Sequence, residues 1–137
     1  MTRDGIQMKT LTALEERVIR MLLAGGNPIL ATLRSQAENL AVSSRELTGA
    51  GFFTRLVVRE NAPSIGIERS FKLGDVNGTA ENVRNGLGFL LFVEDGFLSA
   101  LEGYTYDDRW SDDVRGLDLD YSGGSNRNLE RLRLLIN

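Results

Sequence analysis

The sequence predicts a single α+β domain in which an N-terminal helical hairpin packs on one face of an antiparallel sheet. Three observations support this class. Apolar residues repeat with helical spacing up to Leu40, the repeat then changes to every second residue, and short turns such as Asp95-Gly96 link the later segments. We expect a curled sheet of five or six strands and a short C-terminal helix. A chain of 137 residues suffices for one hydrophobic core, so we expect one domain over 1–137, with 1–10 as a loose tail.

Two amphipathic helices are predicted before residue 41. The first has an apolar stripe with charged residues between its members: Leu11, Leu14, Val18 and Leu22 against Glu15, Glu16, Arg17 and Arg20. Gly25-Gly26 is typical of a helix end, and Asn27-Pro28 is typical of an N-cap followed by the first helical residue. Because the link between the two helices is short, we expect them to form an antiparallel hairpin.

Alternation of apolar and polar residues predicts the strands. The segments concerned are 42–48, 51–60, 65–73, 86–94, 97–106 and 117–121. Asn77-Gly78 and Asp95-Gly96 predict tight turns, because these residue types tolerate a positive φ. The segment 86–94 is apolar on both faces, so the sheet should curl around a core or be covered by a partner or a second copy.

The last segment, 125–137, predicts a short helix, with a possible Asn or Ser cap and apolar residues at helical spacing. Leu132, Leu134 and Ile136 also alternate, which leaves a strand as the alternative.

The residue content restricts the chemistry. The chain has no histidine and no cysteine, which removes the commonest general base and the usual ligands of zinc, copper and haem. Its net charge is −3 and it has no basic stripe, which argues against nucleic acid as a ligand. No apolar run approaches the roughly 18 residues of a membrane span, and the N-terminus does not resemble a signal peptide. We therefore expect a cytoplasmic protein without a cofactor, and the residue content favours a non-enzymatic role.

A calcium loop is the first metal site to test, since Asp118, Asp120, Ser122 and Gly123 match four positions of an EF-hand loop. The position that must supply a bidentate carboxylate is Leu129, and the preceding segment alternates like a strand where an EF-hand needs a helix. We therefore predict no metal site.

Glu102 is the candidate for carboxylate chemistry, because it lies within an apolar strand where an inward side chain would be desolvated. A hydrolytic pair needs a second carboxylate about 5–10 Å away, and Glu46 or Asp75 could supply it. The simpler alternative is that Glu102 faces water or pairs with an arginine such as Arg55. A small-molecule-binding or hydrolytic domain with a pocket near Glu102 is accordingly the second functional hypothesis.

The segment 94–121 combines nine acidic residues with all three tyrosines and the only tryptophan. Tyr and Trp dominate binding hot spots, and carboxylates around them attract surfaces that carry Arg or Lys. The predicted partner-binding residues are Tyr104, Tyr106, Asp107, Asp108, Trp110, Asp112 and Asp113. The alternative is that Trp110 packs onto the end of the sheet while the aspartates cap turns in a solvated loop.

The stretch GFLLFVEDGFLSALEGYTYDDRW, with RELTGAGFFTRL before it, resembles a group of small uncharacterised bacterial α+β proteins. They share a helical hairpin followed by G-F-F-T, an apolar strand, D-G and an L-E-G-[FY]-T-Y segment. The similarity covers most of 11–121 and implies a fold but no activity and no catalytic residue. Proteins of this size and kind are often accessory or immunity-like.

The leading hypothesis is a non-enzymatic protein-interaction domain, specifically an immunity or antitoxin-type inhibitor. In it, the acidic-aromatic loop binds a basic protein partner, with the carboxylates attracting that partner and the aromatic rings anchoring it. We expect no membrane or nucleic-acid partner. A homodimer through the sheet or a strand edge is compatible with either hypothesis.

Overall fold

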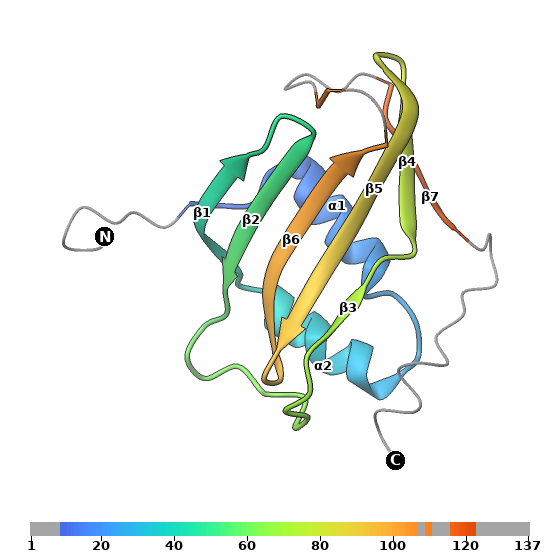
Figure 1. Ribbon diagram of the computed structural model, residues 1–137. Helices are drawn as coiled ribbons and strands as arrows, with labels where there is room; N and C mark the ends of the chain where they lie inside the picture. Colours follow the sequence, from blue (N-terminus) through green and yellow to red (C-terminus); the bar gives the residue numbers. More distant parts are fainter. Residues whose placement is uncertain (1–8, 107–108, 111–115, 123–137) are drawn as a thin grey trace.

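The computed structural model describes residues 9–106, 109–110 and 116–122 (Figure 1). Two helices precede an open sheet of seven antiparallel strands, and both helices lie against the same face of that sheet (Figure 1). The predicted α+β class is confirmed, with seven strands in place of the five or six expected. The predicted C-terminal helix, and all of the predicted N-terminal tail except Lys9 and Thr10, lie outside the described residues.

Helix α1 spans Ala13–Leu22 and begins with a capping box. The Thr12 hydroxyl accepts from the Glu15 backbone N–H at 3.1 Å, and the Glu15 carboxylate accepts from the Thr12 N–H at 2.8 Å. Helix α2 spans Pro28–Ala37, and the predicted Asn27 cap accepts from a backbone N–H of its first turn. Among the described residues, neither helix is long and apolar enough to cross a membrane.

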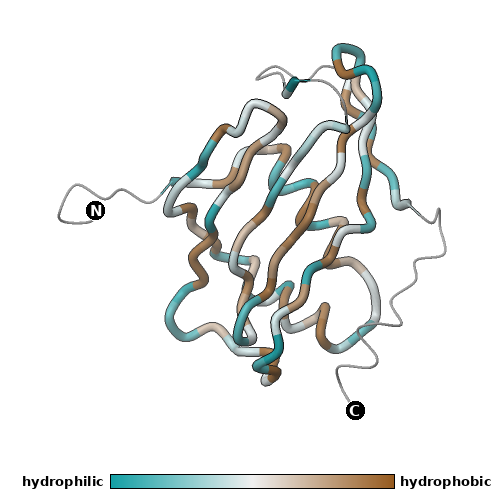
Figure 2. Tube along the Cα trace, viewed as in Figure 1, coloured by the Kyte–Doolittle hydropathy of each residue, from teal (hydrophilic) through white to brown (hydrophobic). Residues whose placement is uncertain are grey.

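The strands are β1 Ala41–Leu47, β2 Gly51–Val57, β3 Phe71–Leu73, β4 Val76–Ala80, β5 Val83–Glu94, β6 Phe97–Thr105 and β7 Asp118–Tyr121. Their order across the sheet is β1-β2-β6-β5-β4-β7, and β3 also pairs with β5. Strand β5, which contains the doubly apolar segment 86–94, is central in the sheet, since it pairs with β6 on one side and with β3 and β4 on the other. Apolar residues follow these central strands in Figure 2.

The predicted turn at Asn77-Gly78 is wrong, because both residues lie inside β4. Gly78 packs closely there: an added Cβ would lie 3.1 Å from the side chain of Leu119 on the neighbouring strand. The chain reverses instead after Ala80, which pairs with Val83 across the turn. A glycine in a strand can therefore be required by close packing rather than by a turn.

The Asp95-Gly96 hairpin is confirmed, with φ of 52° and 89° at its two residues and β5 and β6 on either side. The predicted strand 65–73 is shorter in the structure, where pairing is confined to β3. Gly66 has a φ of 78°, which interrupts the extended backbone before that strand.

The core fills the space between the helices and the sheet face that they cover, which we call the inner face. Its largest fully buried side chains include Phe89, Leu22, Leu23, Leu30, Leu33, Leu87, Leu91 and Leu101. Gln36 of α2 is completely buried among them and uses its whole amide. It donates to the carbonyls of Pro63 and Gly96 at 2.8 and 2.9 Å, and accepts from the Leu98 N–H at 2.9 Å. Helix α2 is thereby tied to the β5–β6 turn.

Candidate functional site

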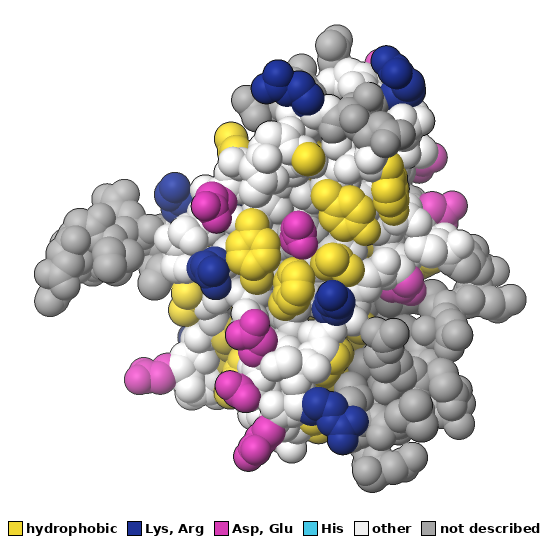
Figure 3. Space-filling view, in the orientation of Figure 1, with side chains coloured by type: hydrophobic (Ala, Val, Ile, Leu, Met, Phe, Trp, Pro, Cys, Tyr) yellow, Lys and Arg dark blue, Asp and Glu magenta, His cyan; other side chains and the backbone are white. Residues whose placement is uncertain are grey.

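The opposite side of the sheet, the outer face, is not covered by either helix (Figure 1). Hydrophobic side chains gather over the middle of this face in Figure 3, with acidic and basic side chains among and around them. Side chains alternate between the two faces along a strand, so the neighbours of buried inner residues point to the outer face. The large hydrophobic side chains among these outward residues form what we call the aromatic cluster: Phe53, Leu90, Phe92, Tyr104 and Tyr106.

The rings of the aromatic cluster contact each other in two pairs. Phe53 and Phe92 lie 5.9 Å apart between centroids, and Tyr104 and Tyr106 lie 5.5 Å apart at an interplanar angle of 85°. Tyr106 is the most exposed member, at 53%. An aromatic patch of this kind, open to solvent, is typical of a surface that another molecule covers.

Tyr104 is held in place from several sides. Its ring lies over Gly88 of β5, where an added Cβ would come within 2.4 Å of the ring. The adjacent Tyr106 hydroxyl donates to the Asn77 side-chain oxygen at 3.2 Å. Burial, the hydrogen bond with Tyr106 and the nearby Glu102 charge together raise the pKa of Tyr104 to about 12. The phenol is therefore neutral and fixed in orientation at pH 7.

Glu102 lies at the centre of the outer face. Its neighbours across the strands are Phe53 on β2 and Leu90 on β5, and Tyr104 is the next outward residue on its own strand. In the part of the chain that the structure describes, its carboxylate forms no ion pair with Arg55 or with any other cation. Of the two simpler alternatives, pairing with Arg55 is not present there, and Glu102 lies on the outward face of the sheet.

Two cations of the outer face lie over phenyl rings instead. The Arg55 guanidinium is 5.2 Å from the Phe53 centroid, and the Lys72 ammonium is 5.9 Å from the Phe92 centroid. Strand alternation places five carboxylates on this face, Glu46, Glu94, Glu102, Asp118 and Asp120, against the cations Arg55, Lys72 and Arg84. The outer face thus carries more negative than positive charge among the described residues.

The structure separates Trp110 from the two predicted tyrosines. Its ring packs edge-on against Phe52 and Phe89, at centroid distances of 5.1 and 6.4 Å. Phe52 and Phe89 belong to the buried core on the inner face, whereas the tyrosines lie on the outer face. The four predicted aspartates, Asp107, Asp108, Asp112 and Asp113, lie outside the described residues.

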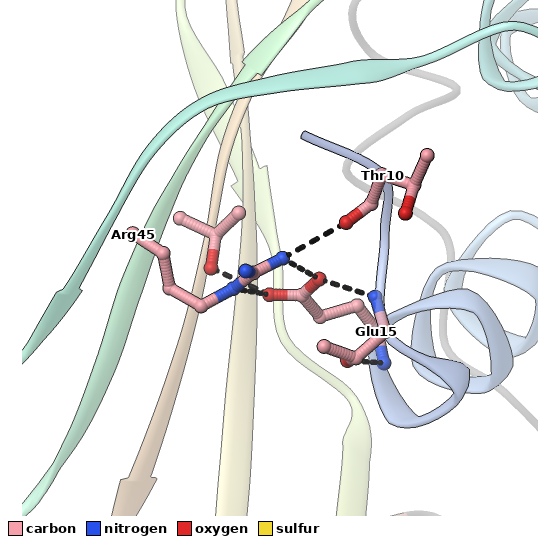
Figure 4. A network of polar contacts seen from close by, with 5 residues as sticks. Thr10, Glu15 and Arg45 are labelled. Carbon is pink, nitrogen blue, oxygen red and sulfur yellow. Dashed lines mark hydrogen bonds and ion pairs between the residues drawn. The ribbon is translucent and has the colours of Figure 1, made fainter. Parts of the chain in front are cut away.

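One acidic residue of α1, Glu15, is buried on the inner side of the sheet. The sequence pattern did not predict this, because it placed all charged residues of α1 on an exposed face. Glu15 is only 1% exposed and forms a two-point ion pair with Arg45 of β1, at 2.7 and 2.9 Å (Figure 4). The Thr54 hydroxyl donates to the same carboxylate at 2.6 Å, and Arg45 also donates to the Thr10 carbonyl. The T-x-x-E spacing from Thr12 indicates the helix cap, but nothing in it indicates burial.

Two opposing effects act on the pKa of Glu15. Burial raises it, but the hydrogen bonds from Arg45, Thr54 and the Thr12 backbone, with the Arg45 charge, outweigh burial and hold it below its ordinary value. The Glu15 charge is therefore fully compensated, and this group connects α1 to β1 and β2 as a structural element.

Two cavities lie away from Glu102. One of about 520 Å³ opens beside the helices, lined by Leu11, Glu16, Ile19, Arg20, Leu23, Arg34, Ala37 and Glu38. The other, of about 240 Å³, lies beside Trp110 and the β1–β2 turn. The pocket predicted near Glu102 is neither of these, and Glu102 itself lies on an open face. The described residues contain no cluster of three potential metal ligands.

Comparison with protein-family models, with curated proteins and with solved structures finds no match for the chain. The resemblance to small bacterial α+β proteins remains a prediction. The function is therefore inferred from the geometry of the molecular surface.

Proposed function

We propose that the chain is a non-enzymatic protein-interaction domain that binds a basic protein partner through the outer face of its sheet. The observation that carries this proposal is the aromatic cluster, which neither described helix covers. At its centre lies Glu102, which pairs with no cation among the described residues. Phe53, Phe92 and Tyr104 are partly buried in the fold, so a partner would cover their remaining exposed area together with the more exposed ring of Tyr106.

The charges of the outer face indicate the chemistry of the partner. Five strand carboxylates against three strand cations give this face a negative balance among the described residues. Opposite charge in the rim of an interface speeds association and selects the partner. A partner that presents apolar side chains together with Arg or Lys fits this surface better than an acidic one.

The proposed role is that of an immunity or antitoxin-type inhibitor. A sequence without histidine or cysteine has few of the usual catalytic groups, whereas an inhibitor needs only a rigid, complementary surface. The aspartates at 107, 108, 112 and 113 remain predicted contributors that would extend the acidic rim. A toxin encoded beside this gene, neutralised by co-expression of the chain, is the result expected from this role.

The interaction surface can be tested before the partner is identified. A phage-displayed library of random 16-residue peptides is selected against the folded chain, and binders are titrated against two variants. Tyr106→Ser removes an exposed ring of the aromatic cluster, and we expect at least tenfold weaker binding. Leu47→Ser is the matched control, since Leu47 is 65% exposed but lies on an inward position of β1. Binding to that variant should be unchanged.

Two outcomes contradict the proposal. Selected peptides that bind Tyr106→Ser as tightly as the unmodified chain would place the interaction surface elsewhere. A concentration-dependent dimer in sedimentation equilibrium, lost in Tyr106→Ser, would show that a second copy covers the outer face instead of a basic partner.

A further inference from the structure

Glu102 has an environment that a carboxylate seldom has without a partner. It is half-buried, with Phe53 and Leu90 beside it on the flanking strands and Tyr104 next to it on its own strand. Charged groups in apolar surroundings are normally paired, because desolvation without compensation costs free energy. In the described structure no cation pairs with Glu102, so its carboxylate is open to a cation of another molecule.

The cations of this face show which kind of group its rings accept. Arg55 places its guanidinium over Phe53, and Lys72 places its ammonium over Phe92. Tyr104 is the ring beside Glu102 that carries no such cation among the described residues. One ring face and one carboxylate therefore stand next to each other, both without a positive partner in that part of the chain.

This pair of groups is already organised for binding. Tyr104 rests on Gly88 and packs at nearly a right angle to the ring of Tyr106, which is in turn hydrogen-bonded to Asn77. A ring that is fixed before binding loses little conformational entropy when a ligand settles on it. The glycine in β5 is what allows the ring to lie flat on the sheet, because a Cβ there would collide with it.

We propose that an arginine side chain of the partner binds here, with its guanidinium stacked on Tyr104 and bonded to the Glu102 carboxylate. This anchor rests on the proposed function and names the group that the outer face recognises. A guanidinium is planar, so it can stack on a ring while it presents two N–H groups to a carboxylate. An ammonium binds as a point charge and satisfies only one of these contacts well at a time.

The experiment uses three small probes with the folded full-length chain: N-acetyl-arginine amide, N-acetyl-lysine amide and N-acetyl-citrulline amide. Citrulline keeps the shape of arginine but carries no charge. Backbone amide chemical shifts are followed by NMR during each titration. We expect saturable shifts at 88–90 and 102–104, with affinity falling from arginine to lysine to citrulline.

Two variants locate the effect. Glu102→Gln should weaken arginine binding at least fivefold, and so should Tyr104→Leu, which removes the ring. The control is Glu46→Gln, a carboxylate on the same face whose neighbouring ring, Phe53, is already covered by Arg55. It should leave the titration unchanged, and all three variants should keep the native amide spectrum away from the substitution.

Citrulline binding as tightly as arginine overturns the anchor, and so does an equal loss in Glu46→Gln, which would reflect general attraction to an acidic face. The experiments distinguish a failure of the arginine anchor from a failure of the proposed function. Selected peptides that lose binding to Tyr106→Ser but not to Glu102→Gln overturn the anchor and leave the function standing. Saturable arginine binding with no peptide sensitive to Tyr106→Ser supports the site but contradicts the protein-binding function.

Discussion

The two faces of the sheet each place one carboxylate among apolar side chains, and they compensate it in different ways. On the inner face, Glu15 accepts from Arg45, Thr54 and the Thr12 backbone, so every part of its charge has a partner in the same chain. On the outer face, Glu102 has aromatic neighbours but no ion pair among the described residues. The comparison separates a carboxylate that stabilises the fold from one that is available for binding.

The strongest test of this comparison is to remove the cation from the inner face. Arg45→Ala leaves the buried Glu15 carboxylate without its ion pair, and we expect the free energy of unfolding to fall by about 3–5 kcal/mol. Urea denaturation followed by circular dichroism measures it. Arg55→Ala on the outer face is the matched control, with an expected loss below about 1 kcal/mol. Equal losses in the two variants would remove the distinction between the faces.

The contribution of the Glu15–Arg45 ion pair to stability should also be visible as the pH is lowered. Because the folded state holds the pKa of Glu15 below the ordinary value of 4.5, its contribution to stability is present above about pH 4.5 and is lost as the pH falls through the lower folded-state value. Wild type should therefore lose more stability than Arg45→Ala between pH 6 and pH 3. Denaturation curves at both pH values give this difference, and parallel losses would show that Glu15 is not held in this way.

The outer face should respond at alkaline pH. The pKa of Tyr104 is raised to about 12 from an ordinary value of 10, so its contribution to stability is present below pH 10 and is lost as the pH rises toward 12. Absorbance at 295 nm should show a late-ionising tyrosine that Tyr104→Phe removes. Glu102→Gln should move that late ionisation to lower pH, because a nearby negative charge disfavours phenolate. No movement would mean that the two groups are not coupled.

The smallest expected effect is that of Glu102→Gln on stability. A carboxylate without a partner in the fold contributes little to it, so the free energy of unfolding should change by less than about 0.5 kcal/mol. Thermal and urea denaturation at pH 7 measure this change. A loss as large as that of Arg45→Ala would mean that Glu102 belongs to the structure and would weaken its assignment to binding.

Local signals in the sequence predicted much of the fold. The Asn27-Pro28 start of α2 and the Asp95-Gly96 hairpin are confirmed because each depends on the conformational preferences of adjacent residues. Asn77-Gly78 carries the same kind of signal but lies in a strand. There the packing of Leu119 against Gly78, and not the local turn preference, determines the conformation. Tertiary contact outweighed local propensity at that position.

The candidate site was predicted only in part. Tyr104 and Tyr106 are brought together on one face, because residues two apart in a strand point the same way. The sequence does not reveal that Trp110 turns to the inner face, nor that Glu15 meets Arg45 thirty positions later. Both depend on the path of the chain between distant segments, which periodicity does not encode.

The position of β2 beside β6 has a consequence for how the chain is made. Strand β2 pairs with β1 along one edge and ends at Val57, but β6, which pairs with its other edge, begins only at Phe97. During synthesis the edge of β2 that faces β6 stays unpaired until β6 has left the ribosome. We expect protease resistance to appear abruptly in ribosome-bound chains once β6 has emerged. Gradual protection of shorter chains would show that the N-terminal part folds alone.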